Sequence, residues 1–177
     1  MKPLWTRAVR LVVGVALLAG WAGAVTATAG PCESPPHRAF DFWIGEWVVS
    51  LADGREAGRN RIEREQGGCV LVERWEGAQG GTGVSLNFYD PAAEAWRQVW
   101  ISPQTQIDVS GGLADGSMVL EGTITYLEDS RTHPFRGTWT PLEDGRVRQF
   151  FEEAREPGEW KPWFEGFYRR AAADSGS

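Results

Sequence analysis

The sequence predicts an all-β protein: a single up-and-down antiparallel meander of about ten strands, closed into a barrel. Turn signals that contain Gly, Pro, Asp or Ser recur along the chain at 52–54, 67–68, 79–81, 90–91, 102–103, 114–116, 128–130, 143–145 and 157–158. The segments between these nine turns are rich in β-branched and aromatic residues, and none is long enough for a long helix as well. A meander of this length leaves two exposed edges, and closure into a barrel removes them. Two stacked sheets are the alternative.

Residues 1–29 have the three parts of a secretory signal. Lys2, Arg7 and Arg10 precede an uncharged, mostly apolar run at 11–25, and an A-x-A cleavage pattern ends at Ala29. The apolar run is shorter than the roughly 20 residues that a spanning helix needs. We therefore expect an exported protein, periplasmic or extracellular, with no membrane association after cleavage.

The charge of the exported part excludes one class of partner. Removal of residues 1–29 takes away three of the 18 basic residues and none of the 24 acidic ones, which leaves a net charge of −9 on 148 residues. A chain this acidic repels phosphate backbones, so we expect no nucleic-acid partner. The remaining length suits one domain.

Two cysteines, Cys32 and Cys69, remain after cleavage. An isolated pair in an exported protein favours a disulfide, with two buried free thiols as the alternative. The disulfide would tie a leader at 30–38 to the strand that starts at Cys69. The barrel domain is then predicted at 39–171, followed by a disordered tail at 172–177.

The first and last strands carry a matched pair of features. Gly45 and Trp47 form a G-x-W motif, and the last strand ends in Arg169 and Arg170. This combination resembles the lipocalin and wider calycin pattern. The resemblance implies that Trp47 closes one end of the barrel and stacks on one of the two arginines, while Gly45 lets the backbone approach closely.

A wider set of motifs covers most of residues 40–170. The run FDFWIGEW at 40–47, the G-x-S-x-N-x-Y-D pattern at 83–90 and the W-x-Q-x-W pattern at 96–100 resemble a family of uncharacterised exported bacterial proteins with lipocalin-like domains. The resemblance implies a fold and leaves the function open. Ten strands and no helix after the barrel are closer to fatty-acid-binding proteins and nitrobindin-like barrels. The latter hold haem through one strand histidine, for which His133 is the only candidate here, and we predict no cofactor.

The aromatic residues just before the first strand need a place to pack. Phe40, Phe42 and Trp43 are predicted to form a short turn that covers an open side of the barrel. A ligand-binding role for these three residues is the alternative.

The hairpin at 82–102 carries the strongest functional signal. Its turn can place Tyr89 opposite Trp96, and strand residues alternate between faces. One face then holds polar and aromatic residues: Ser85, Asn87, Tyr89, Trp96, Gln98 and Trp100. The other is almost entirely aliphatic: Val84, Leu86, Phe88, Arg97, Val99 and Ile101. If the first face points inward, it lines a small-molecule cavity; if it points outward, it forms an exposed aromatic stripe for a protein partner.

We predict the cavity, and therefore a barrel that binds a small, partly polar organic ligand without transforming it. Glu73 lies in a strand-like run, and a buried charge must be paired, so Arg74 or Arg148 is its expected partner. Such a pair could orient a polar ligand, which adds Glu73 to the candidate site, and a purely structural ion pair is the alternative. The enzyme alternative is a cofactor-independent isomerase or hydrolase that uses Glu73 or Tyr89 as its acid–base group. If the polar face of the 82–102 hairpin points inward, its aliphatic face lies on the outside and needs cover. The N-terminal segment or a second subunit in a homodimer could provide it.

No other motif supports catalysis or metal binding. Glu152 and Glu153 are neighbours on a strand and face opposite sides, so they cannot act as a carboxylate dyad. The two histidines, His37 and His133, stand far apart and belong to no metal-binding pattern. We expect no metal site.

Overall fold

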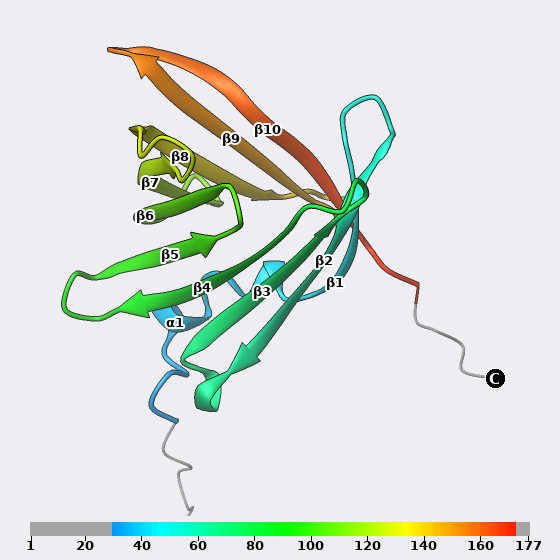
Figure 1. The fold of residues 1–177 in the computed structure, drawn as a ribbon. Helices are drawn as coiled ribbons and strands as arrows, with labels where there is room; N and C mark the ends of the chain where they lie inside the picture. The colour runs from blue at the N-terminus through cyan, green and yellow to red at the C-terminus, as the bar shows by residue number, and fades with distance from the viewer. Residues whose placement is uncertain (1–29, 173–177) are drawn as a thin grey trace, which may run out of the picture.

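The computed structural model describes residues 30–172, in which ten antiparallel strands close into one barrel (Figure 1). Each strand pairs with its neighbours in the chain, and the first strand pairs with the last. The strands are β1 (Gly45–Ser50), β2 (Glu56–Glu65), β3 (Val70–Gly77), β4 (Thr82–Asp90), β5 (Ala95–Ile101), β6 (Thr105–Ala114), β7 (Ser117–Tyr126), β8 (Thr132–Pro141), β9 (Val147–Glu156) and β10 (Glu159–Arg170). The predicted up-and-down barrel is confirmed, and every predicted turn overlaps a connection between two consecutive strands.

The helices of residues 30–172 are short: α1 (Pro35–Arg38), and the 3-10 turns η1 (Asp41–Trp43) and η2 (Gln66–Gly68). None of them has the length and apolar character that crossing a membrane requires. The predicted signal at 1–29 and most of the predicted tail, at 173–177, lie outside the described residues.

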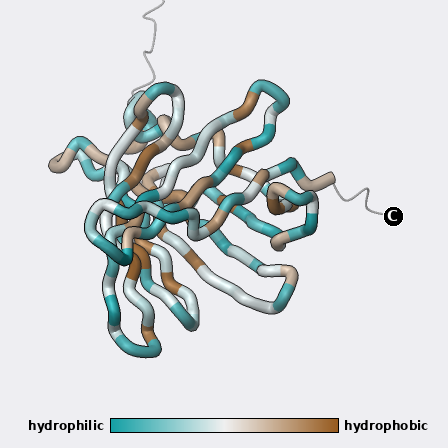
Figure 2. Tube along the Cα trace, turned by 90° about the horizontal axis from the view of Figure 1, so that it is seen from above, coloured by the Kyte–Doolittle hydropathy of each residue, from teal (hydrophilic) through white to brown (hydrophobic). Residues whose placement is uncertain are grey.

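Buried and exposed residues alternate along strands such as β4 and β6, and Figure 2 shows apolar stretches (brown) interspersed with polar ones (teal) along the chain. The inward positions of β6 to β8, among them Ile107, Leu120 and Phe135, form an apolar part of the barrel interior. Cross-strand ion pairs such as Arg97–Asp108 and Arg136–Glu152 lie on the outside. This period of two fixes which side chains reach the interior.

The N-terminal segment packs into one end of the barrel, called here the closed end. Phe40 and Trp43 are fully buried there and stack with their ring centroids 5.0 Å apart. Phe40 also packs in T-shaped arrangements with Trp96 and Trp139, with ring-centroid distances of 5.5 and 5.3 Å. The predicted turn at 40–43 is therefore a plug of aromatic rings.

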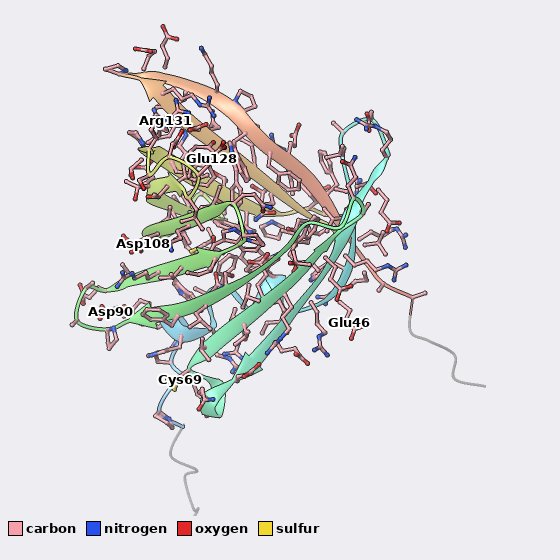
Figure 3. The ribbon with its side chains drawn as sticks, viewed as in Figure 1. Glu46, Cys69, Asp90, Asp108, Glu128 and Arg131 are labelled. Carbon is pink, nitrogen blue, oxygen red and sulfur yellow. A yellow bond between two sulfur atoms is a disulfide. The ribbon has the colours of Figure 1, made fainter. Side chains whose placement is uncertain are left out.

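A disulfide joins Cys32 to Cys69, as predicted. Cys69 stands just before β3, beside the N-terminal segment (Figure 3). The bond thus ties the plug to the barrel wall. Disulfides persist in oxidising compartments, so this bond is typical of a protein that works outside the cytoplasm.

Trp47 completes the closed end. Its Nε1 donates to the carbonyl of Trp43 at 2.9 Å, and the guanidinium of Arg170 lies 3.9 Å from its ring centroid. Gly45 has a φ of +136°, and a Cβ at this position would overlap the Arg170 guanidinium. Arg169 makes no such contact with Trp47: neighbours on a strand face opposite sides, and its guanidinium donates to the carbonyl of Arg170 instead.

Candidate functional site

The 82–102 hairpin has the predicted register and turns its polar face inward. Ser85 pairs with Trp100, Asn87 with Gln98 and Tyr89 with Trp96. Ser85, Asn87 and Gln98 are almost completely buried, at 1%, 0% and 2% exposure. Amides and hydroxyls placed in an interior must hydrogen-bond to one another or to a ligand.

A hydrogen-bonded chain crosses β5, β4 and β3. Gln98 Nε2 donates to Asn87 Oδ1 at 2.7 Å, and Asn87 Nδ2 donates to Ser85 Oγ at 2.7 Å. Ser85 Oγ in turn donates to Glu73 Oε2. Three of the predicted site residues therefore form a chain that ends at a fourth, the carboxyl of Glu73.

The chain continues from Glu73 to the opposite side of the barrel. Asn60 on β2 donates its Nδ2 to Glu73 Oε1 at 2.7 Å and to the Tyr168 hydroxyl at 3.2 Å. Tyr168 on β10 donates to Gln149 Oε1 on β9. Burial, together with the nearby charge of Glu73, raises the pKa of Tyr168 well above 10, so it remains a neutral donor. Asn60, Gln149 and Tyr168 were not in the predicted site.

Glu73 is a buried carboxyl with neutral partners. The expected ion pair with Arg74 or Arg148 is wrong: Arg74 pairs with Glu63 and Glu65, and Arg148 pairs with Glu165. Burial raises the pKa of Glu73 from an ordinary 4.5 to about 7, against the hydrogen bonds from Ser85 and Asn60, which lower it. The carboxyl therefore changes its charge near neutral pH.

A cavity of about 150 Å³ opens beside this carboxyl, away from the closed end. Its lining consists of Glu73, Trp75, Trp100, Gln149, Trp163, Phe164 and Tyr168. A second hollow of about 180 Å³ shares the three tryptophans and extends past Thr82, Ser102 and Gln104. Because the two hollows share these tryptophans, they lie next to each other, one toward the loops at 78–81 and 102–104 and the other toward the polar residues inside.

Local backbone features shape the aromatic wall of this cavity. The register between β9 and β10 shifts at Pro162–Phe164, so Trp163 is an extra residue that joins Phe164 on the inner side. The Trp163 indole donates to the Tyr126 hydroxyl at 3.1 Å. Across the cavity, a Cβ at Gly83 would overlap the Trp100 ring, so this glycine makes room for the indole.

Of the seven predicted site residues, only Glu73 and Trp100 line the cavity. Ser85, Asn87 and Gln98 reach it only through the hydrogen-bonded chain that ends at Glu73. The other two lie elsewhere in the barrel. The Trp96 indole N–H donates to the Pro36 carbonyl, and Tyr89 packs edge-on against His37 with the ring centroids 5.0 Å apart. Both residues therefore belong to the closed end. Face alternation placed them correctly on the inner side, but it does not say how far along the barrel a residue lies. In the opposite direction along the same hairpin, Trp100 does line the cavity.

The exposed aromatic stripe required for a protein-interaction module is absent from this hairpin, because that face points inward. Its outer side instead exposes Val84, Leu86 and Ile101, each about half accessible. The expectation that the N-terminal segment covers this outer face is wrong for residues 30–44, which pack at the closed end. A homodimer through the outer face stays a prediction.

Within residues 30–172, no three His, Cys, Asp or Glu side chains gather as a metal site would require. His133, the one residue considered for haem, lies at the start of β8 and is half-buried, with its ring 6.2 Å from that of Tyr126. Of the acidic neighbours on β9, Glu153 is buried and Glu152 pairs with Arg136 outside.

The raised pKa of Glu73 predicts a pH-dependent stability. Between pH 4.5 and about 7 the folded protein keeps a proton that the unfolded chain releases, so stability falls with rising pH in this window and is constant above it. The loss amounts to up to about 3 kcal/mol. Urea unfolding measured across this pH window should show a free energy of unfolding that falls with pH in the wild type, and this slope should be absent in Glu73→Gln. Glu76→Gln, on the outer side of the same strand, should keep the slope; a slope that survives in Glu73→Gln contradicts the assignment.

Comparison of the chain with models of protein families and with curated proteins finds no match. The function is therefore inferred from the geometry and chemistry of the barrel's own residues.

Proposed function

We propose that the protein is an exported, lipocalin-like barrel that binds a small, partly polar organic molecule in the cavity beside Glu73. The observation that supports this most is the lining itself: aromatic walls that end at one carboxyl, one amide and one phenol. Apolar walls with a few convergent polar groups are the usual composition of a ligand site. An interior with a purely structural role would be more stable with aliphatic side chains, since every buried polar group requires a hydrogen-bond partner.

Export is supported by the tripartite pattern at 1–29 and by the Cys32–Cys69 disulfide. Mass spectrometry of the intact protein recovered from the periplasm or the medium tests export, and the mass should be that of a chain that starts at Gly30. A chain that retains residues 1–29 contradicts it.

Benzyl alcohol is a suitable probe because its ring matches the indole walls and its hydroxyl can reach the polar end. We predict that it shifts or quenches tryptophan emission, and that Trp100→Phe removes part of this response. Trp139→Phe is the matched control, because Trp139 is buried at the closed end and its Nε1 has no partner within the described residues. A response that is unchanged in Trp100→Phe, or no response at all, contradicts binding in this cavity.

Acid–base catalysis by Glu73 is a second candidate function, favoured by a carboxyl with a pKa of about 7 beside a cavity. Tyr89 is no longer a candidate, since it lies at the closed end against His37. Deuterium uptake into the α-carbons of cyclohexanone tests this function. An enzyme would accelerate the exchange in the wild type and not in Glu73→Gln; a binding protein leaves the rate unchanged in both.

A further inference from the structure

Aromatic rings from three strands line one small volume. Trp75 comes from β3, Trp100 from β5, and Trp163 with Phe164 from β10. The ring centroids of Trp75 and Phe164 lie 6.3 Å apart in an edge-to-face arrangement. The faces of indole rings carry negative electrostatic potential, and several of them around one point form a favourable environment for a cation.

The charge balance of the cavity points the same way. Among the described residues, Glu73 is the only acidic or basic one in its lining, apart from the neutral phenol of Tyr168. The groups that face it are Asn60 on β2, Ser85 on β4, Gln149 on β9 and Tyr168 on β10, and none of them is cationic. Two basic side chains line a hollow on the other side of Trp163, and both have partners: Arg155 contacts Glu153 and Tyr126, and Lys161 pairs with Glu159. An ionised Glu73 therefore has no positive partner within residues 30–172.

Glu73 also has acceptor capacity left. Each carboxylate oxygen accepts one hydrogen bond, from Asn60 or Ser85, and a carboxylate can accept about four in total. A cationic N–H group in the cavity would use this capacity and supply the missing charge.

We propose that the ligand is a small organic ammonium ion, with its charged nitrogen at Glu73 and its hydrocarbon body between the indoles. This inference rests on the proposed function and adds the charge of the ligand to it. A cavity of about 150 Å³ accommodates a benzene-sized group. Benzylammonium is therefore the matched cationic probe, and benzyl alcohol is its neutral counterpart.

Binding of such a cation depends on the charge of Glu73. Below a pH of about 7 the carboxyl is protonated and the attraction is lost, whereas above it the carboxylate is present. Benzylammonium keeps its charge throughout this range, so a pH dependence reports on the protein. Benzyl alcohol should bind with little change across the same range.

The test is a calorimetric titration of the two probes into the wild type at about pH 8 and about pH 5.5. We expect benzylammonium to bind about tenfold or more tightly than benzyl alcohol at the higher pH, and to lose that advantage at the lower one. Glu73→Gln should bind benzyl alcohol and show no preference for the cation at either pH. Glu76→Gln, which removes the same charge from the outer face of β3, should behave as the wild type.

The outcomes separate this inference from the proposed function. If benzyl alcohol binds as tightly as benzylammonium at the higher pH, or if Glu73→Gln keeps the preference, the ammonium ligand is wrong and the binding function stands. If neither probe binds, both are wrong. The wild-type pH series distinguishes these outcomes even where Glu73→Gln fails to fold.

Discussion

Replacing Trp47 by alanine is expected to lower the free energy of unfolding by about 3–5 kcal/mol, as truncation of a fully buried large aromatic does. The indole is 1% exposed and hydrogen-bonds to the Trp43 carbonyl, so its loss leaves a cavity and an unpaired acceptor at the closed end. Chemical unfolding of the purified variant measures the change. Trp163→Ala is the matched control and should lose much less, because Trp163 is 40% exposed.

The arginine beside Trp47 sharpens this prediction. Arg170→Ala should destabilise the barrel measurably, since the guanidinium lies over the indole and donates to the Ile44 carbonyl. Arg169→Ala, next to it on the exposed face, should change the stability little. Equal effects of the two substitutions, or a Trp47→Ala variant as stable as the wild type, would show that Trp47 does not close the barrel.

Loss of the disulfide should have a comparable effect. Cys32 and Cys69 are 37 residues apart, and a cross-link over such a loop contributes about 4 kcal/mol on the chain-entropy account. The double Cys32→Ser, Cys69→Ser variant should therefore melt about 10 °C below the wild type. The fully reduced wild type should match it. A double variant with an unchanged melting temperature would mean that the N-terminal plug is held by its aromatic contacts alone.

The two effects are linked through the same segment. The disulfide fixes the start of residues 30–44, and Phe40 and Trp43 anchor its end in the core. Interactions between parts of one packed unit are generally not additive. The triple variant that also carries Trp47→Ala is therefore expected to deviate from the sum of the separate losses.

The fold followed from local signals. Each of the nine turn patterns lies at a connection between strands, and the 82–102 register followed from one turn and the alternation of faces. The orientation of that hairpin did not follow from the hairpin itself. It depends on the polar partners that other strands supply: Asn60 and Glu73 from the neighbouring strands β2 and β3, and Tyr168 from β10, which reaches them only after the barrel closes.

Two errors at the site have identifiable causes. Arg74 is the chain neighbour of Glu73, and Arg148 is the neighbour of inward-facing Gln149, so strand alternation places both arginines outside. The same alternation is visible in the sequence and could have excluded both ion pairs. The inward position of both Trp163 and Phe164 results from a register shift in β10. Pro162 was the available signal, because a proline inside a closed sheet favours a bulge, but it does not say which side chains the bulge turns inward.

The most direct test of the central proposal follows the indole N–H signals of the eight tryptophans after residue 29 in a ¹⁵N–¹H spectrum, assigned by single Trp→Phe variants. Titration with benzylammonium at about pH 8 should shift the signals of Trp75, Trp100 and Trp163 and leave those of Trp43, Trp47 and Trp139 in place. Shifts confined to Trp160, which packs against Arg136 outside the cavity, or no shift of the three cavity tryptophans, would contradict a ligand site inside the barrel.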